Sequence, residues 1–191
     1  EETVRIDMDD DAYTTTVTVT DAAGTYTDVI NCALGFPACY HGDTIEGDGY
    51  TELFLTGDAG SVDYETFLYR LTADGLQRAD LSVGRVLQAY GNGLLEFAVM
   101  IDALGTYEAT CSYEMDDQMH FTLKTGYTIT EYDRIWDIRK LTLQADGLSA
   151  MRTSPGEAEL VALDAGTELL LTYVDMGADP SAVLRDKDGA T

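Results

Sequence analysis

The sequence predicts an all-β protein built as a mostly antiparallel meander of short strands. β-Branched and aromatic residues alternate with polar ones through most of the 191 residues. Gly, Asp and Asn punctuate this pattern at short intervals, and no stretch keeps a helical period of apolar residues. Such a meander can close into a sandwich, a barrel or a partial propeller, and the pattern is compatible with all three.

The strands are expected in an even series along the chain. They lie near residues 4–8, 14–20, 26–31, 52–56, 66–72, 76–81, 85–90, 94–101, 107–113, 119–124, 127–132, 140–144, 150–152, 168–174 and 182–185. Several connections are tight, because residues 21–24, 73–75, 91–93 and 146–147 carry the Gly, Asn and Asp that hairpin turns with positive φ demand.

The net charge is strongly negative. Lys and Arg number 11 and Asp and Glu number 35, which gives −24 at neutral pH. No basic residue stands between Arg5 and Arg70, so this third of the chain carries the strongest negative potential. Nucleic acids and anionic membranes are therefore not expected partners, because both are bound through Lys and Arg. Plain solubility or a high-salt habitat would explain the acidity equally well.

The location is expected to be outside the cytoplasm. Apolar residues make up 45% of the chain, but no run reaches the roughly 20 residues of a transmembrane helix. The chain opens at Glu1 on an acidic segment of the kind that remains when an export signal has been removed. We expect a protein that is secreted or anchored at a bacterial cell surface.

The cysteines bear on the same question. Cys32 and Cys39 flank residues 33–38, whose Gly and Pro can turn the chain back on itself. A local disulfide between them is the candidate pairing, and it would fit an oxidising compartment. Cys111 lies in an alternating strand pattern and is expected to be a buried thiol.

An acidic loop over residues 43–52 is the best candidate site. Glu46, Asp48 and Glu52 are spaced as calcium ligands often are, with Gly49 among them to make a sharp turn. The loop leads directly into an apolar strand that begins at Leu53.

This text resembles the FG-GAP or VCBS-type repeats of secreted bacterial proteins, in which a calcium loop precedes a propeller strand. Residues 47–55 match the second half of that motif, whereas Thr44 stands where the family has its first Asp ligand and Asp43 comes one residue early. The alternative is an acidic turn that positions a strand without metal. The candidate metal positions are Asp43, Glu46, Asp48, Tyr50 through its backbone carbonyl, and Glu52.

A weak domain boundary is expected at the polar Pro-Gly turn over residues 153–156. Residues 1–147 would form the main β domain and residues 148–191 a small module. The text of residues 148–155 and 160–169 resembles the opening of bacterial SH3-like domains, and the resemblance extends over residues 148–189. It implies a cell-wall or peptide-binding module. The alternative is one β domain over residues 1–191.

No catalytic residue is predicted. Nucleophile elbows, phosphate-binding Gly-rich loops and metalloprotease motifs are absent from the sequence, and its two histidines, His41 and His120, are expected to be structural or surface residues. The basic cluster over residues 133–140 is expected to pair with the acidic surface. Carboxylates beside aromatic residues could form a sugar platform, although packing explains them too; they are Asp63, Glu65, Glu131, Asp133 and Asp137, next to Tyr64, Tyr132 and Trp136.

The function expected from these observations is binding without catalysis. The ligand would be a glycan, a peptide or an envelope protein, with calcium in the acidic loop as the candidate cofactor. A carboxylate-dependent hydrolase on a β scaffold and a structural spacer without ligand are the alternatives.

Overall fold

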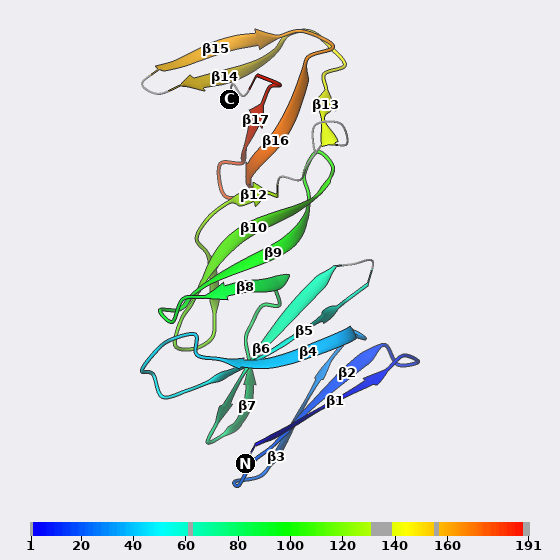
Figure 1. The fold of residues 1–191 in the computed structure, drawn as a ribbon, viewed down its shortest axis with the longest axis vertical. Helices are drawn as coiled ribbons and strands as arrows, with labels where there is room; N and C mark the ends of the chain where they lie inside the picture. The colour runs from blue at the N-terminus through cyan, green and yellow to red at the C-terminus, as the bar shows by residue number, and fades with distance from the viewer. Residues whose placement is uncertain (1, 61–62, 131–138, 155–156, 189–191) are drawn as a thin grey trace. The chain divides into compact units, whose positions relative to one another are not determined.

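The computed structural model describes residues 2–60, 63–130, 139–154 and 157–188, and the regular elements of these residues are strands (Figure 1). Every strand pairing with a determined register is antiparallel. The predicted all-β, antiparallel fold is therefore confirmed. Within the described residues, no helix is long and apolar enough to cross a membrane.

The chain divides into two compact units. Unit 1 comprises residues 1–100 and 111–124, and unit 2 comprises residues 101–110 and 125–191. The expected boundary at residue 147 does not coincide with this division, because residues 125–147 group with the C-terminal strands. An SH3-like module from residue 148 stays a prediction.

Unit 1 begins with two antiparallel sheets. The first contains β1 (Thr3–Asp9), β2 (Thr14–Thr20) and β3 (Thr25–Ile30). The second contains β4 (Gly35–Gly42), β5 (Glu52–Asp58), β6 (Tyr64–Thr72) and β7 (Gly75–Arg78), in that order. The unit also holds β8 (Arg85–Ala89), β11 (Phe121–Leu123), and most of β9 (Leu94–Asp102), which pairs with β8 and with β10 (Thr106–Met115).

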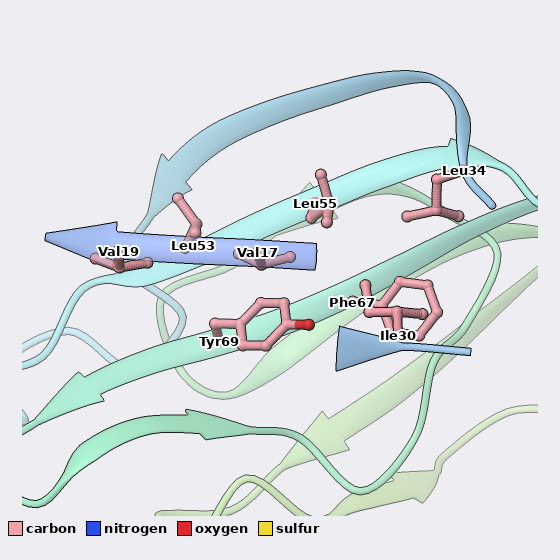
Figure 2. Close-up of a cluster of buried hydrophobic side chains, with 8 residues drawn as sticks. All are labelled: Val17, Val19, Ile30, Leu34, Leu53, Leu55, Phe67 and Tyr69. Atoms are coloured by element: carbon pink, nitrogen blue, oxygen red, sulfur yellow. The ribbon is translucent and has the colours of Figure 1, made fainter. Parts of the chain in front are cut away.

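The core of unit 1 lies between the first two sheets, as Figure 2 shows. In β2 the threonines and valines alternate, so that Val17 and Val19 point from one face into the core. Side chains of β5 and β6, such as Leu55 and Tyr69, meet them from the facing sheet. The two sheets thus pack as a sandwich, and no sheet among the described strands closes into a barrel.

Unit 2 is built around the long strand β16 (Glu168–Asp175). Its neighbours are β12 (Tyr127–Ile129), β13 (Leu141–Thr142) and β17 (Ser181–Arg185). β14 (Leu148–Ser154) and β15 (Glu157–Leu163) form a separate hairpin. β4 and β15 are strands that the sequence pattern did not predict, whereas the other strands of both units overlap the expected ranges.

Candidate functional site

Glu52 is the most deeply buried residue of the acidic loop. It opens β5 and has no exposed surface. Its Oε1 accepts hydrogen bonds from Nε and Nη2 of Arg70, at 2.9 and 2.6 Å. Its Oε2 accepts from the backbone N–H and the hydroxyl of Thr44, at 3.0 and 2.7 Å. Both carboxylate oxygens are thus held inside the protein.

Arg70 is the centre of this arrangement, which we call the Arg70 network. It stands opposite Glu52 in the β5–β6 register and is 2% exposed. Its Nη2 also donates to Oδ2 of Asp48 at 3.0 Å, and its Nη1 donates to the carbonyl of Asp117 at 2.9 Å. The guanidinium lies over the ring of Tyr50, 4.5 Å from the ring centre. A side-chain cation therefore stands among the loop's carboxylates.

The predicted metal ligands are thus only partly brought together. Asp48 and Glu52 meet on Arg70, and Tyr50 contributes its ring. Asp43 and Glu46 are exposed, and Glu46 is tied through its backbone N–H to the carbonyl of Gly91 at 2.7 Å. Within the described part of the chain, no group of three or more His, Cys, Asp or Glu side chains is placed to hold a metal ion. Calcium binding stays a prediction, and calcium would have to compete with Arg70 for Glu52.

The cysteines are free thiols, and the expected bridge between Cys32 and Cys39 is not formed. Cys32 follows β3, whereas Cys39 lies inside β4, opposite Leu55. The Cys32 thiol instead lies 3.9 Å from the carbonyl oxygen of Ala59, four residues beyond the Leu55 that pairs with Cys39. The segment that looked like a turn is a strand.

A second location in unit 1 has the shape of a binding site. We call it the polar hollow, and its volume is about 740 Å³. β3, β6, β7 and the segment that follows β7 surround it, and the turn between β1 and β2 contributes Tyr13. Its polar lining residues are Tyr13, Asp28, Asn31, Cys32, Glu65, Arg78, Asp80 and Ser82.

Internal hydrogen bonds hold the three carboxylates of the polar hollow. Oδ2 of Asp28 accepts from Arg78 at 2.8 Å and from the hydroxyl of Tyr69 at 3.0 Å. Glu65 accepts from Ser82 at 2.9 Å through Oε2, and Oδ1 of Asp80 accepts from a backbone N–H at 3.2 Å. Among the described residues, these bonds use one oxygen of each carboxylate. For the second oxygen of each carboxylate, the described contacts include no hydrogen bond.

Tyr13 supplies an aromatic ring at the polar hollow. Its backbone has φ of 52°, a left-handed conformation that bulky residues rarely adopt. Its hydroxyl donates to the carbonyl of Ala59 at 3.1 Å, while the side chain keeps much of its surface exposed. The ring is therefore fixed at one end and open to solvent.

Cys32 in the hollow is not an activated nucleophile. Burial raises the pKa of its thiol, and the negative charge of Glu65 raises this pKa further, against a smaller lowering by the Tyr13 hydroxyl. The thiol is protonated at neutral pH, whereas a catalytic cysteine needs the thiolate. The pKa of the Tyr69 hydroxyl is likewise raised, first by burial and then by Asp28.

Other residues singled out in the sequence lie apart from the hollow or outside the described residues. Asp63 and Tyr64 are exposed, and His41 is exposed on β4. His120 lies 3.3 Å from Asp116; the pKa of the Asp116 carboxyl is lowered, foremost by a hydrogen bond from the His120 backbone N–H. The residues outside the description are Glu131, Tyr132, Asp133, Trp136 and Asp137, together with positions 155–156 of the expected boundary turn.

Two described residues of the basic cluster pair internally. Arg139 donates to the carbonyl of Thr106 at 2.8 Å, and Lys140 lies 2.5 Å from a carboxylate oxygen of Glu168. Of these two residues, Lys140 thus has the expected acidic partner, whereas Arg139 contacts a backbone carbonyl and not a carboxylate.

The comparisons with known proteins found no match for the chain. No protein-family model matches it, and neither a curated protein nor a solved structure does. The resemblances to calcium-loop repeats and to SH3-like domains therefore stay predictions.

Proposed function

We propose that the protein is a non-enzymatic, extracytoplasmic bacterial domain that binds a glycan in the polar hollow of unit 1. The observation that carries the proposal is the lining of the hollow. Carboxylate, amide and hydroxyl groups surround a volume of about 740 Å³ beside the ring of Tyr13. This volume falls within the roughly 300–1,000 Å³ of small-ligand sites.

Sugar chemistry matches this lining. Sugar hydroxyl groups donate hydrogen bonds to carboxylate oxygens such as those of Glu65 and Asp80, and accept them from donors such as the Asn31 amide. Such bonds to charged acceptors are stronger than those between neutral groups. The exposed ring of Tyr13 offers an apolar face to the C–H side of a sugar ring. Because the lining carries three carboxylates against one Arg, neutral and amino sugars fit better than sulfated or phosphorylated ones.

The hydrolase alternative rests on the same residues. Asp28, Glu65 and Asp80 all line the polar hollow, and glycosidases work with a pair of carboxylates. Asp28 is already neutralised by Arg78 at 2.8 Å. Binding needs only hydrogen-bonding groups and an apolar face, whereas hydrolysis also needs an acid and a base in the correct geometry. We therefore favour binding, and the experiment below distinguishes the two functions.

The proposed location rests on composition and on the calcium-loop resemblance. The acidity and the β content of the chain support an exported protein, whereas the free cysteines add nothing to this part of the proposal. Calcium in the acidic loop is kept as a separate proposal. It is supported by the spacing of the loop and by the exposed carboxylates of Asp43 and Glu46.

The test is calorimetric titration with a panel of neutral and N-acetylated tetrasaccharides. We expect one class to bind, and Glu65→Gln to weaken that binding about tenfold, because a charged acceptor is lost. Asp63→Asn is the matched control, since Asp63 is an exposed acid two residues away that does not line the hollow. Thermal unfolding of both variants checks that they are folded.

Two results would count against the proposal. Absence of binding across the panel up to about 1 mM would contradict it. Cleavage of the bound tetrasaccharide, seen by chromatography of the recovered sugar, would replace it with the hydrolase alternative.

A further inference from the structure

The turn between β10 and β11 is closed by the side chain of its first residue, Asp116. We call residues 116–120 the Asp116 turn. Oδ1 of Asp116 accepts hydrogen bonds from the backbone N–H groups of Gln118 and His120, each at 2.9 Å. The backbone of Asp116 adds two more, because its N–H donates to the carbonyl of His120 at 3.1 Å and its carbonyl accepts from the N–H of Met119 at 2.9 Å. One residue thus bonds to three others of the same turn.

The backbone of Met119 shows that the Asp116 turn needs such support. Its φ is 63°, a left-handed conformation that is costly for a side chain of this size, and its side chain is fully buried. A conformation of this kind persists only where the surrounding contacts hold it. The bonds from Gln118 and His120 to Asp116 hold the chain on both sides of Met119. Loss of the Asp116 side chain should therefore allow the turn to open.

The Asp116 turn holds one residue of the polar hollow, Asp80, at two points. The N–H of Asp80 donates to the carbonyl of Met119 at 3.5 Å. Oδ1 of Asp80 accepts at 3.2 Å from the N–H of Phe121, the first residue after the turn. Asp80 follows β7 and lies outside the strands, and the described contacts of its carboxylate include no other hydrogen bond. The orientation of this carboxylate therefore depends on the turn.

Two further hydrogen bonds anchor the Asp116 turn. The carbonyl of Asp117 accepts from Nη1 of Arg70 at 2.9 Å, and the carbonyl of Gln118 accepts from Nε2 of Gln77 at 3.2 Å. Arg70 is itself buried and held by two carboxylates. All these residues belong to unit 1. The turn is therefore tied to the Arg70 network at one place and to the polar hollow at another.

We propose that Asp116 is a positioning residue of the polar hollow, which keeps the carboxylate of Asp80 in one orientation. The consequence for a ligand rests on the proposed function, whereas the orientation of Asp80 is a property of the free protein. Asp116 does not line the hollow, so it acts through its turn and through the N–H of Phe121. A carboxylate that is oriented before binding loses less freedom when a sugar hydroxyl binds to it, and the affinity is higher for that reason.

The first experiment measures amide hydrogen exchange of the ligand-free full chain by NMR. We expect Asp116→Ala to speed exchange at the N–H of Phe121 at least about tenfold, because the turn that aligns this group opens. The side chain of Asp116 is 56% exposed, so its removal leaves the core unchanged. Asp116→Asn keeps an oxygen that accepts from both N–H groups, and slow exchange should return.

Asp117→Ala is the matched control for the exchange measurement. It removes the same charge from the same turn, and Asp117 is exposed. The hydrogen bond from Arg70 uses the backbone carbonyl of Asp117, which alanine retains. We expect exchange at Phe121 within about twofold of the wild-type rate. Thermal unfolding shows whether each variant is folded.

The second experiment measures affinity for the tetrasaccharide that binds most tightly in the calorimetric panel. We expect Asp116→Ala to weaken binding about fivefold, and Asp116→Asn and Asp117→Ala to change it by less than about twofold. Asp80→Ala removes the carboxylate that the turn positions. In the Asp80→Ala background, Asp116→Ala should change the affinity by less than about twofold, because nothing is left to position. A residue that only stabilised the fold would weaken binding equally in both backgrounds.

Three results would overturn the proposal. They are unchanged exchange at Phe121 in Asp116→Ala, equal effects of Asp116→Ala and Asp117→Ala on exchange or affinity, and an undiminished effect of Asp116→Ala in the Asp80→Ala background. If no sugar of the panel binds the wild type, the proposed function fails, and the exchange rates alone decide whether Asp116 positions Asp80.

Discussion

At the scale of single residues, the Arg70–Glu52 pair is the feature with the largest energetic consequence. Both side chains are almost fully buried, with 3% and 0% of their surface exposed. Removing ions from water costs several kcal/mol each, and the pair is tolerated only when hydrogen bonds satisfy the charged groups. Here Thr44 donates the further hydrogen bond to Glu52, and Arg70 donates further hydrogen bonds to Asp48 and to the carbonyl of Asp117.

We predict that Arg70→Met lowers the free energy of unfolding by about 3–5 kcal/mol, because Glu52 is left buried without a counterion. Urea denaturation measures the change. Arg78→Met is the control; its partner Asp28 is partly exposed, and a loss of about 0–1 kcal/mol is expected. Similar losses in the two variants would mean that the Arg70 pair is weakly coupled.

The same variant tests calcium. Without the guanidinium, oxygens of Asp48 and Glu52 become available, so we expect calcium to raise the thermal midpoint of Arg70→Met more than that of the wild type. Each protein is unfolded in millimolar calcium and in chelator. A rise of the thermal midpoint in the wild type alone would favour a calcium site formed by the exposed carboxylates. If the midpoint rises in neither protein, the loop does not bind calcium.

The thiols give a third prediction. Cys39 is exposed, Cys32 is half-buried, and Cys111 is 2% exposed with a thiol pKa raised to about 11, foremost by burial. At about pH 8 the native protein should therefore be alkylated first at Cys39 and last at Cys111, because the thiolate is the reactive form. Mass spectrometry without reductant checks the order. Denatured protein should add three labels. A single label would instead show that Cys32 and Cys39 form a disulfide.

At the scale of the elements, the sequence pattern predicted strands best where one face is buried. β2 matched its expected range because its valines alternate with threonines. β4 was missed because Gly35, Phe36 and Pro37 have the composition of a turn. Proline is accepted there since β4 is an edge strand, and the register shift between Gly35 and Ala38 accommodates it.

The candidate sites were less accessible to sequence reasoning than the strands. The Arg70 network depends on pairing between strands 18 positions apart, and the register that places Arg70 beside Glu52 is set by tertiary packing. Glu65 was among the predicted sugar-platform carboxylates, but Asp28 and Asp80 join it only through the fold. The lining of a hollow by distant residues leaves no local pattern in the sequence.

Close backbone approach gives a prediction at this scale. A Cβ on Gly84 would lie 2.1 Å from the carbonyl oxygen of Ala98, the residue opposite Arg85 in β9. Gly84→Ala should therefore destabilise the protein by about 3 kcal/mol, since the strand must shift. Gly24→Ala is the control, because its nearest atom would be 3.5 Å away, and a change within about 0.5 kcal/mol is expected. Urea denaturation measures the free energy of unfolding of both variants. Equal losses would show that β9 shifts at little cost in stability.

At the scale of the whole molecule, the net charge of −24 is the dominant property. Like charges repel one another more strongly in the compact state than in the expanded chain, and salt screens this repulsion over about 10 Å at 0.1 M. The acidity therefore lowers stability in dilute buffer.

We predict that the thermal midpoint rises between about 0.02 and 0.5 M sodium chloride. Scanning calorimetry measures the midpoint, and an uncharged osmolyte at equal osmolality is the control for solvent exclusion. A midpoint that falls or stays level with salt would show that ion pairs such as Lys140–Glu168 outweigh the repulsion.

The Arg70 network also differs from a metal site in how its cation is supplied. A metal ion leaves its ligands when its concentration falls or when a competing chelator arrives. The guanidinium of Arg70 is carried by the chain, and it holds Glu52 and Asp48 from the moment the chain folds. The contacts that hold Glu52 and Asp48 on Arg70 therefore require no dissolved ion.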